Sequence, residues 1–294
     1  MKHFQIYLIL LLTTFTGIHQ AAANEPVPYV IYQSNGKTTS YEKMVKAFKD
    51  AQVVFFGELH NNTLNHWLEF QVLKSLYEQD KNIALAMEML EADNQLIIDE
   101  YLNGTIQERH LFKEAKLWDR YKTDYHPMVE FCKEKQLPVI ASNIPQRYAN
   151  LVYRNGLESL DKLSDEGKKV IAPLPIKVDL NLPGYASMMQ QMGGHGTASS
   201  QGSAANLANA QAVKDATMAH FILKNLQKKI FHVNGAYHSQ NYEGIVWYLK
   251  QAQPDIRIIT IHVVEQDQVD KLSEEHLKSA DFIICIPKDM TKSY

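Results

Sequence analysis

Six short apolar segments, separated by stretches of helical pattern, constrain the fold of this chain more than any other feature. Each segment is rich in Val, Ile and Phe and is apolar almost throughout, without the alternation typical of a strand with one face in water. Such segments indicate strands covered on both faces, as in a parallel sheet between two layers of helices. They are Val53–Gly57, Ile83–Glu88, Pro138–Asn143, Ile230–Asn234, Ile256–His262 and Asp281–Ile286.

The stretches between these segments carry apolar residues at helical spacing. Three- and four-residue spacing over Leu64–Tyr77 predicts a helix, and Gln211–Leu226 and Tyr242–Lys250 show the same pattern. Strands that alternate with helices predict an α/β fold with a mostly parallel central sheet and helices on both faces.

The longest gap, at about residues 144–229, separates the third predicted strand from the fourth. It contains a helical pattern over Arg147–Leu160 and a Gly/Ser-rich stretch, Gly193–Ser200, that we expect to be loose. An insertion of this length is typical of a cap over a binding site. The sequence therefore predicts a helical cap inserted between the third and fourth strands.

The first residues have the pattern of a secretory signal peptide. Lys2 precedes the apolar run Ile6–Phe15, and the small residues Ala21–Ala23 follow. The run is too short to cross a bilayer comfortably, and no cysteine lies near its end for lipid attachment. We therefore expect residues 1–23 to be removed and the domain of residues 24–294 to be exported, either periplasmic or secreted.

Charge and cysteine content exclude some functions. Removing Lys2 with the signal changes the formal net charge from −3 to −4. A general nucleic-acid binder needs a basic face for phosphates, so we expect no nucleic-acid partner. Cys132 and Cys285 do not form a Cys-x-x-Cys pair and are interpreted as buried small side chains.

Polar side chains gather where four of the predicted strands end. Two of the ends are Gly-x-x-His turns, Gly57–His60 and Gly235–His238, whose glycines would let the chain turn sharply. Ligands of a parallel α/β sheet bind outside the carboxyl ends of its strands. The polar side chains there are Glu58, His60, Glu88, Asn143, Arg147 and His238.

These residue types suit acid–base or metal chemistry. His60, His238 and Glu58 are ligand types for a divalent metal, and Glu58 or Glu88 could act as a base on bound water. Arg147 could hold a carboxylate or phosphate, or stabilise developing negative charge. The structural alternatives are histidines that only satisfy local hydrogen bonds and a buried ion pair between Glu88 and Arg147. His66, on the helix after the first turn, is expected to face outward.

The predicted cap offers a different chemistry. A tyrosine phenolate can hold ferric haem, and flexible methionines suit the flat face of a porphyrin. The alternative is that these residues are ordinary packing within the cap. His195 lies in the Gly-Gly-His-Gly stretch, where a ligand role is also open. The residues concerned are Tyr148, Tyr153, Tyr185, Met188, Met189 and Met192.

Taken in order, five motifs resemble the ChaN-like haem-binding proteins, which belong with Tiki-type proteases and erythromycin esterases in one superfamily. The resemblance spans about Val53 to Val264, most of the chain after the signal. The motifs are Gly57–Asn62, Met87–Met89, Asn143–Pro145 with Arg147, Ala210–Ala219 and Gly235–His238.

The resemblance to the ChaN-like branch implies haem binding by an exported protein in haem or iron uptake. It also implies a homodimer that encloses two stacked haems, a tyrosine ligand to iron, and an outer-membrane haem/iron receptor as a possible partner. Tyr185, near Met189 and His195, is the candidate ligand, and Tyr148 stays open. Some ChaN-like proteins are lipoproteins, whereas this signal ends without a cysteine.

The Tiki-type branch implies the alternative function, a metal-dependent peptidase or esterase. In that reading His60, His238, Glu58 and Glu88 would serve a Mn, Zn or Co ion, with Arg147 beside them.

Overall fold

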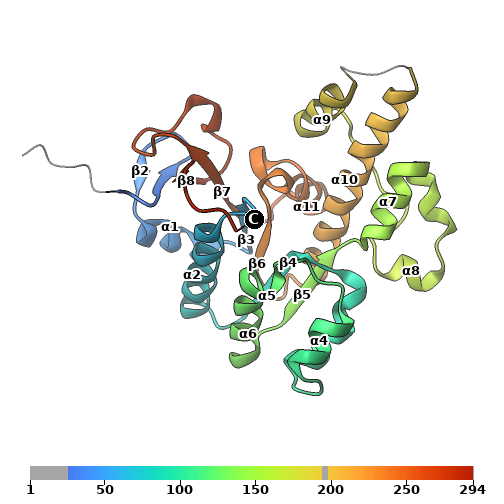
Figure 1. Cartoon of the computed structure of the whole chain (residues 1–294), viewed down its shortest axis with the longest axis horizontal. Coiled ribbons are helices and arrows are strands. Elements are labelled where there is room, and N and C mark those ends of the chain that lie inside the picture. Colours follow the sequence, from blue (N-terminus) through green and yellow to red (C-terminus); the bar gives the residue numbers. More distant parts are fainter. Residues whose placement is uncertain (1–25, 194–197, 294) are drawn as a thin grey trace, which may run out of the picture.

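A mostly parallel sheet forms the centre of the molecule (Figure 1). The structure, a computed structural model, describes residues 26–193 and 198–293. Within them, eight strands lie in the order β2-β1-β8-β7-β3-β6-β4-β5. The six strands from β8 to β5 are parallel, which confirms all six predicted strands and the α/β fold class. They are β3 (Val53–Glu58), β4 (Ile83–Glu91), β5 (Val139–Asn143), β6 (Lys229–Gly235), β7 (Ile258–Gln266) and β8 (Phe282–Pro287).

Two further strands extend the sheet beyond β8 and were not predicted. β1 (Val30–Gln33) pairs antiparallel with β8, and β2 (Thr38–Thr39) pairs antiparallel with β1. With four and two residues, they are too short to show a periodic pattern. Hydrogen bonding of β1 to the edge of β8, and of β2 to β1, decides their place.

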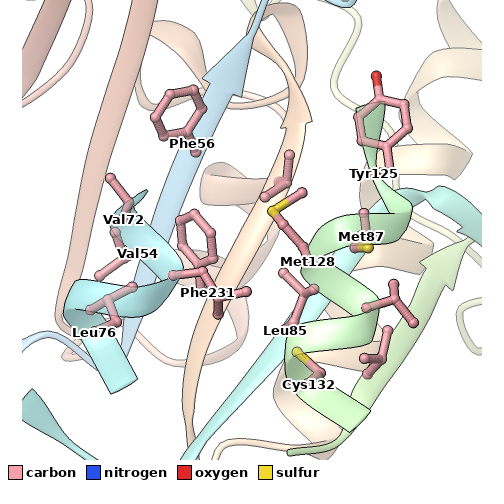
Figure 2. Close-up of a cluster of buried hydrophobic side chains, with 14 of the residues drawn as sticks. Val54, Phe56, Val72, Leu76, Leu85, Met87, Tyr125, Met128, Cys132 and Phe231 are labelled. Atoms are coloured by element: carbon pink, nitrogen blue, oxygen red, sulfur yellow. The ribbon is translucent and has the colours of Figure 1, made fainter. Parts of the chain in front are cut away.

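One face of the sheet packs against a layer formed mainly by α2 (Thr63–Gln79) and α6 (His126–Glu134), with α1 (Tyr41–Ala47) and α3 (Gln95–Leu102) beside them. Figure 2 shows Val54, Phe56 and Phe231 of the strands facing these helices. The helices contribute Val72, Leu76, Met128 and Cys132.

The opposite face is covered by α10 (Ala198–Lys224) and α11 (Ile245–Ala252). Here Val53 and Phe55 of β3 meet Met218 and Ile222 of α10. Successive side chains of a strand point to opposite faces, so a strand covered twice is apolar at every position. This burial on both sides explains the unbroken apolar pattern of the strand segments.

The expected helical insertion lies between β5 and β6. It comprises α7 (Gln146–Asn155), η3 (Leu157–Lys162), α8 (Asp165–Lys169), α9 (Pro183–Gly193) and the first part of α10. In Figure 1, α9 and the start of α10 project away from the sheet, and α10 lies between α11 and α7. The end of α10 packs on the sheet, so this helix joins the cap to the α/β core.

Two details of the cap differ from the prediction. The helical pattern over Arg147–Leu160 is broken at Gly156, whose φ of 79° lies in the left-handed region that favours glycine. The Gly/Ser-rich stretch is not all loop, because α10 begins at Ala198. His195 and the signal segment lie outside the described residues.

Short elements complete the described chain. They are η1 (Phe48–Asp50), η2 (Ala92–Asn94), α4 (Glu108–Glu114), α5 (Tyr121–Asp124), η4 (Ala236–His238), η5 (Gln240–Tyr242) and η6 (Glu274–His276). Cys132 and Cys285 are both buried free cysteines, as predicted. Within the described ranges, none of the helices has the length and apolarity needed to cross a membrane.

Candidate functional site

The carboxyl ends of β3, β6 and β4 lie side by side, with β6 in the middle. Glu58 of β3 pairs in register with Gly235 of β6, and Met87 of β4 pairs with Val233. The residues that follow these pairs therefore meet at one edge of the sheet. This register brings Glu58, Glu88 and the two Gly-x-x-His turns together, as the strand-end positions predicted.

The first cluster surrounds the Glu58 carboxylate. His60 Nδ1 donates to Glu58 Oε1 over 2.5 Å, and the Tyr125 hydroxyl donates to the same oxygen over 2.6 Å. Glu58 is buried, whereas the His60 side chain is 35% exposed. Burial opposes a charged imidazole, but the carboxylates of Glu58 and Glu88 raise the pKa of His60. His60 is thus an accessible imidazole that donates a hydrogen bond to the buried Glu58 carboxylate.

The second cluster is a chain of buried polar groups that links β4 to the cap. Glu88 Oε2 accepts the Gly235 backbone N–H over 2.8 Å, and Glu88 Oε1 lies 3.2 Å from His238 Nε2. His238 Nδ1 donates to Asp215 Oδ1 over 2.6 Å. The Tyr185 hydroxyl then donates to Asp215 Oδ2 over 2.6 Å.

Two carboxylates on either side of His238 decide its charge. Burial alone would lower the pKa of this imidazole, but Glu88 and Asp215 raise it to about 10. Burial would likewise raise the pKa of Glu88, yet His238, His60 and the Gly235 N–H lower it to about 2. At neutral pH the centre of the chain is therefore an ion pair of imidazolium and carboxylate.

The glycines of the two Gly-x-x-His turns leave room for neighbouring groups that pack closely against them. A Cβ atom on Gly235 would lie 2.7 Å from His60 Nε2, and one on Gly57 would lie 3.1 Å from the Ala236 Cα and the Ile261 carbonyl oxygen. Gly235 has φ of −54°, a value open to any residue. The expectation that this glycine allows a sharp turn is therefore wrong: close packing excludes a side chain there.

A third cluster joins the start of α2 to Glu58. His66 Nδ1 lies 3.2 Å from Glu58 Oε2 and 3.4 Å from Glu69 Oε2. Burial would lower the pKa of His66, but Glu69 and Glu58 raise it to about 11. Burial would raise the pKa of Glu58, but the neighbouring Glu69, His60 and His66 lower it. Burial and the Glu58 charge raise the pKa of Glu69.

The expectation that His66 faces outward is wrong, because only 7% of this residue is exposed. The signal was present in the sequence. His66 and Glu69 lie three residues apart, and Leu73 and Leu76 continue the same spacing. The four residues therefore share a face of α2 that is buried throughout.

A pocket of about 550 Å³ opens beside His60. The chain before α6 forms its walls, where the Trp118 ring lies 5.0 Å from the His60 ring and Tyr125 contacts Glu58. The pocket therefore reaches the first cluster from the side of α5. Its lining residues are His60, Trp118, Asp119, Arg120, Asp124 and Tyr125.

Arg147 does not join these clusters. Its Nη1 atom donates to Asp93 Oδ2 over 2.5 Å, and its side chain is 54% exposed. The alternative of a buried ion pair between Glu88 and Arg147 is therefore wrong, since Glu88 is engaged by His238 and Gly235. Arg147 Nη2 donates to the Tyr148 hydroxyl over 3.3 Å, and the guanidinium lies 4.4 Å from the centre of that ring.

The cap residues differ in their availability for haem iron. Tyr185 is buried, and its hydroxyl donates a hydrogen bond to Asp215. Burial and the Asp215 charge raise the pKa of Tyr185. Tyr148 is half-buried and its oxygen accepts a hydrogen bond. Met188 and Met189 are half-buried on α9. Phenol oxygens and thioethers of this kind fit the needs of a haem site.

The predicted metal ligands do not form one group. His60 Nδ1 is bound to Glu58, and His238 Nδ1 and Nε2 face Asp215 and Glu88. In this arrangement three of the four imidazole nitrogens of His60 and His238 face carboxylates. Among the residues that the structure describes, the compact ligand group is Glu58, His66 and Glu69.

Asp215 and Tyr125 are among the site residues that were not singled out from the sequence. Asp215 is the one acidic residue in the mainly apolar helical segment Gln211–Leu226. An acidic residue in such a segment could have marked it as a candidate site residue. Tyr125 gives no such signal, because it reaches Glu58 from a turn 67 residues away in the chain.

With this geometry established, comparison with known proteins gives the family. A family model described as haem-binding uptake, Tiki superfamily, ChaN, matches residues 44–249, well over half of the chain. The chain belongs to the ChaN family. The match runs from α1 to α11, so this ChaN-family chain carries both the strand-end clusters and the cap within the matched region.

Solved structures give the same fold. A structure of Campylobacter jejuni ChaN, described as showing cofacial heme binding, has a TM-score of 0.67 at 18% identity, covering 87% of this chain and 96% of that one. A mutant of erythromycin esterase EreC in its open conformation has a TM-score of 0.51 at 10% identity, covering 87% and 97%. At these identities the likeness shows the fold alone. No curated protein sequence matches the chain.

Proposed function

We propose that this protein is an exported haem-binding protein of haem or iron uptake, which holds haem on its cap through a tyrosine. The observation that carries the proposal is the match of the haem-binding ChaN family model over residues 44–249. That range includes all of α7, α9 and α10, on which the candidate tyrosines and methionines lie.

The geometry favours Tyr148 over Tyr185 as the iron ligand. A phenolate ligand carries negative charge, and the Arg147 guanidinium already lies against the Tyr148 ring and donates to its oxygen. A phenolate at Tyr185 would instead lie 2.6 Å from a buried carboxylate oxygen of Asp215. Repulsion between these two charges disfavours Tyr185.

We further propose that two copies enclose two haems. Campylobacter jejuni ChaN, which shares this fold, is described as binding haem cofacially. Two stacked haems between two caps would bury more apolar area than one haem on one chain, and Met188 and Met189 would pack against them. Haem binding would then favour the dimer by mass action.

A hemin titration of residues 24–294, followed by visible absorbance and light scattering, tests this function. We expect saturation near one haem per chain, a phenolate-type ferric spectrum, and a change from monomer to dimer. Absence of saturable binding would contradict the proposal.

Two matched variants separate the candidate ligands. Tyr148→Phe should abolish the phenolate charge-transfer band, whereas Tyr185→Phe should leave it in place. The reverse result would return the ligand to Tyr185, and an unchanged band in both variants would exclude both residues.

Export and a receptor partner have their own test. Cleavage after Ala23 would place Asn24 at the new N-terminus, which fractionation of cells and N-terminal sequencing would detect. Haem transfer to or from an outer-membrane haem/iron receptor can then be followed by mixing the loaded protein with that receptor.

Hydrolysis is the second candidate, favoured by the Glu58–His60 pair beside a pocket of about 550 Å³. A bound ester or amide there would meet an acid, His60, whose partner is a buried carboxylate. Peptide and ester hydrolysis should be assayed with and without Mn, Zn or Co. A rate that His60→Ala does not reduce would exclude this activity.

A further inference from the structure

Three side chains from β3 and α2 lie close together in the protein interior. Glu58 comes from the end of β3, and His66 and Glu69 come from the first two turns of α2. One ligand atom from each lies within 4.8 Å of the others. Glu69 is fully buried, and Glu58 and His66 are 2% and 7% exposed. The group is therefore compact and shielded from bulk water.

The carboxylates of this group hold more oxygen atoms than the surrounding protein satisfies. Within the described part of the chain, Glu58 Oε2, Glu69 Oε1 and the neighbouring Asp124 Oδ2 are buried without a hydrogen-bond partner. The single Nδ1 position of His66 faces Glu58 and Glu69 together, and one proton there serves only one of them. Buried, unpaired carboxylate oxygens are costly unless a cation compensates them.

The imidazole of His66 is held in the orientation that a metal ligand needs. Its Nε2–H donates to the His60 carbonyl oxygen over 3.1 Å, and this bond points Nδ1 at the two carboxylates. Metal-binding histidines commonly use their second nitrogen in this way, because the bond to a carbonyl fixes the ring and its tautomer. The Tyr125 ring, 5.0 Å from the His66 ring, closes the other side.

We propose that Glu58, His66 and Glu69 bind one divalent transition-metal ion, such as Mn²⁺ or Zn²⁺, in the interior beneath the His60 pocket. Two carboxylates and one imidazole are a ligand set that these ions accept. The ion takes the place of the Nδ1 proton of the His66 imidazolium and brings two positive charges to the carboxylates in place of one. It uses neither the cap nor His238, so it is independent of haem.

Asp124 and Tyr125 lie between this site and the pocket beside His60. Both residues line the pocket beside His60, and Asp124 Oδ2 lies 3.6 Å from His66 Nε2. Glu58 connects the two regions, because its Oε1 accepts from His60 while its Oε2 faces His66. A bound ion would therefore also fix the carboxylate that orients His60.

The test is direct binding of Mn²⁺ to the chelator-treated protein, measured by EPR, with Zn²⁺ competing. The wild type should bind one Mn²⁺ per chain, and Glu69→Gln should weaken binding at least tenfold. Glu91→Gln is the matched control, because Glu91 is also buried but is paired with Lys116. Its affinity should equal that of the wild type. No saturable binding by the wild type, or equal binding by Glu69→Gln, would overturn the proposal.

Pulsed EPR of the Mn²⁺-loaded wild type does not depend on whether a variant folds. It should detect one coordinating imidazole nitrogen, from His66. Two imidazole nitrogens would place the ion at His60 and His238 and overturn the assignment. Hemin binding is measured in a separate titration. Absence of Mn²⁺ binding would therefore not contradict the haem proposal, and absence of haem binding would not contradict the metal site.

Discussion

The His60 imidazole occupies the space that a side chain on Gly235 would need. A Cβ atom at Gly235 would lie 2.7 Å from Nε2 and 2.9 Å from Cε1 of that ring. The glycine of the second Gly-x-x-His turn thus makes room for the histidine of the first. The contact lies where β3 and β6 end side by side and the two clusters meet.

Gly235→Ala should displace His60 and destabilise the fold by about 1–3 kcal/mol, the usual cost of forcing a methyl group into a packed site. Urea unfolding measures the loss. The His60→Ala change supplies the control, because removing the ring removes the clash. If Gly235→Ala costs as much in the His60→Ala background as alone, the contact does not cause the effect.

Glu88→Gln should reduce the loss of stability in acid. The pKa of Glu88 is lowered from its usual 4.5 to about 2, so its contribution is complete above pH 4.5 and is lost as the pH falls toward 2. This group accounts for at most roughly 3 kcal/mol of that fall. Urea unfolding at a series of pH values should show a shallower acid slope in the variant. Identical slopes would contradict the ion pair.

His238→Gln tests the same ion pair on the alkaline side. The pKa of His238 is raised from 6.5 to about 10, so its contribution is complete below pH 6.5 and is lost as the pH rises through 10. The wild type should lose stability over this range, and the variant should lose less. Because the two pKa shifts share the His238–Glu88 contact, the two effects should be less than additive in the double variant.

Asp215→Asn should destabilise the protein more than Tyr185→Phe. Asp215 accepts from both His238 and Tyr185, so the change weakens two hydrogen bonds and leaves a buried imidazolium less compensated. We expect about 3 kcal/mol for this change and about 1 kcal/mol for Tyr185→Phe. Thermal and urea unfolding compare the two. Equal losses would mean that His238 draws its charge from Glu88 alone.

Asn62→Ala should weaken the start of α2 by about 1 kcal/mol. The Asn62 side chain caps this helix by accepting the backbone N–H groups of Leu64 and Asn65 over 3.0 and 3.3 Å. Asn61→Ala, outside the helix, is the control and should change little. A loss of similar size at both positions would argue against the cap.

The strands and the edge of the sheet that carries the site were predictable for a local reason. A strand buried on both faces must be apolar at each position, and the polar residues that follow it stand out. This is why all six parallel strands, and the meeting of Glu58, Glu88 and His238, were found. β1 and β2 were missed because they have no pattern of their own: β1 is a strand through its pairing with β8, and β2 through its pairing with β1.

The partners of the site residues were not predictable in the same way. Asp215 reaches His238 only because α10 crosses back over the sheet, and Tyr125 reaches Glu58 only because the chain before α6 folds over β3. Sequence spacing carries no information on such contacts. The same crossing of α10 places the Asp215 carboxylate beside Tyr185, and this carboxylate disfavours Tyr185 as a phenolate ligand of haem iron.

The sequence by itself determined the α/β class, the order of the six parallel strands along the chain, and the polar residues at their ends, because periodicity and burial are local properties. Only the packed structure shows that Tyr125 binds Glu58, that Arg147 pairs with Asp93, and that the His60 ring fills the space beside Gly235. These outcomes depend on how elements far apart in the chain pack together, and packing distances are set by the whole fold.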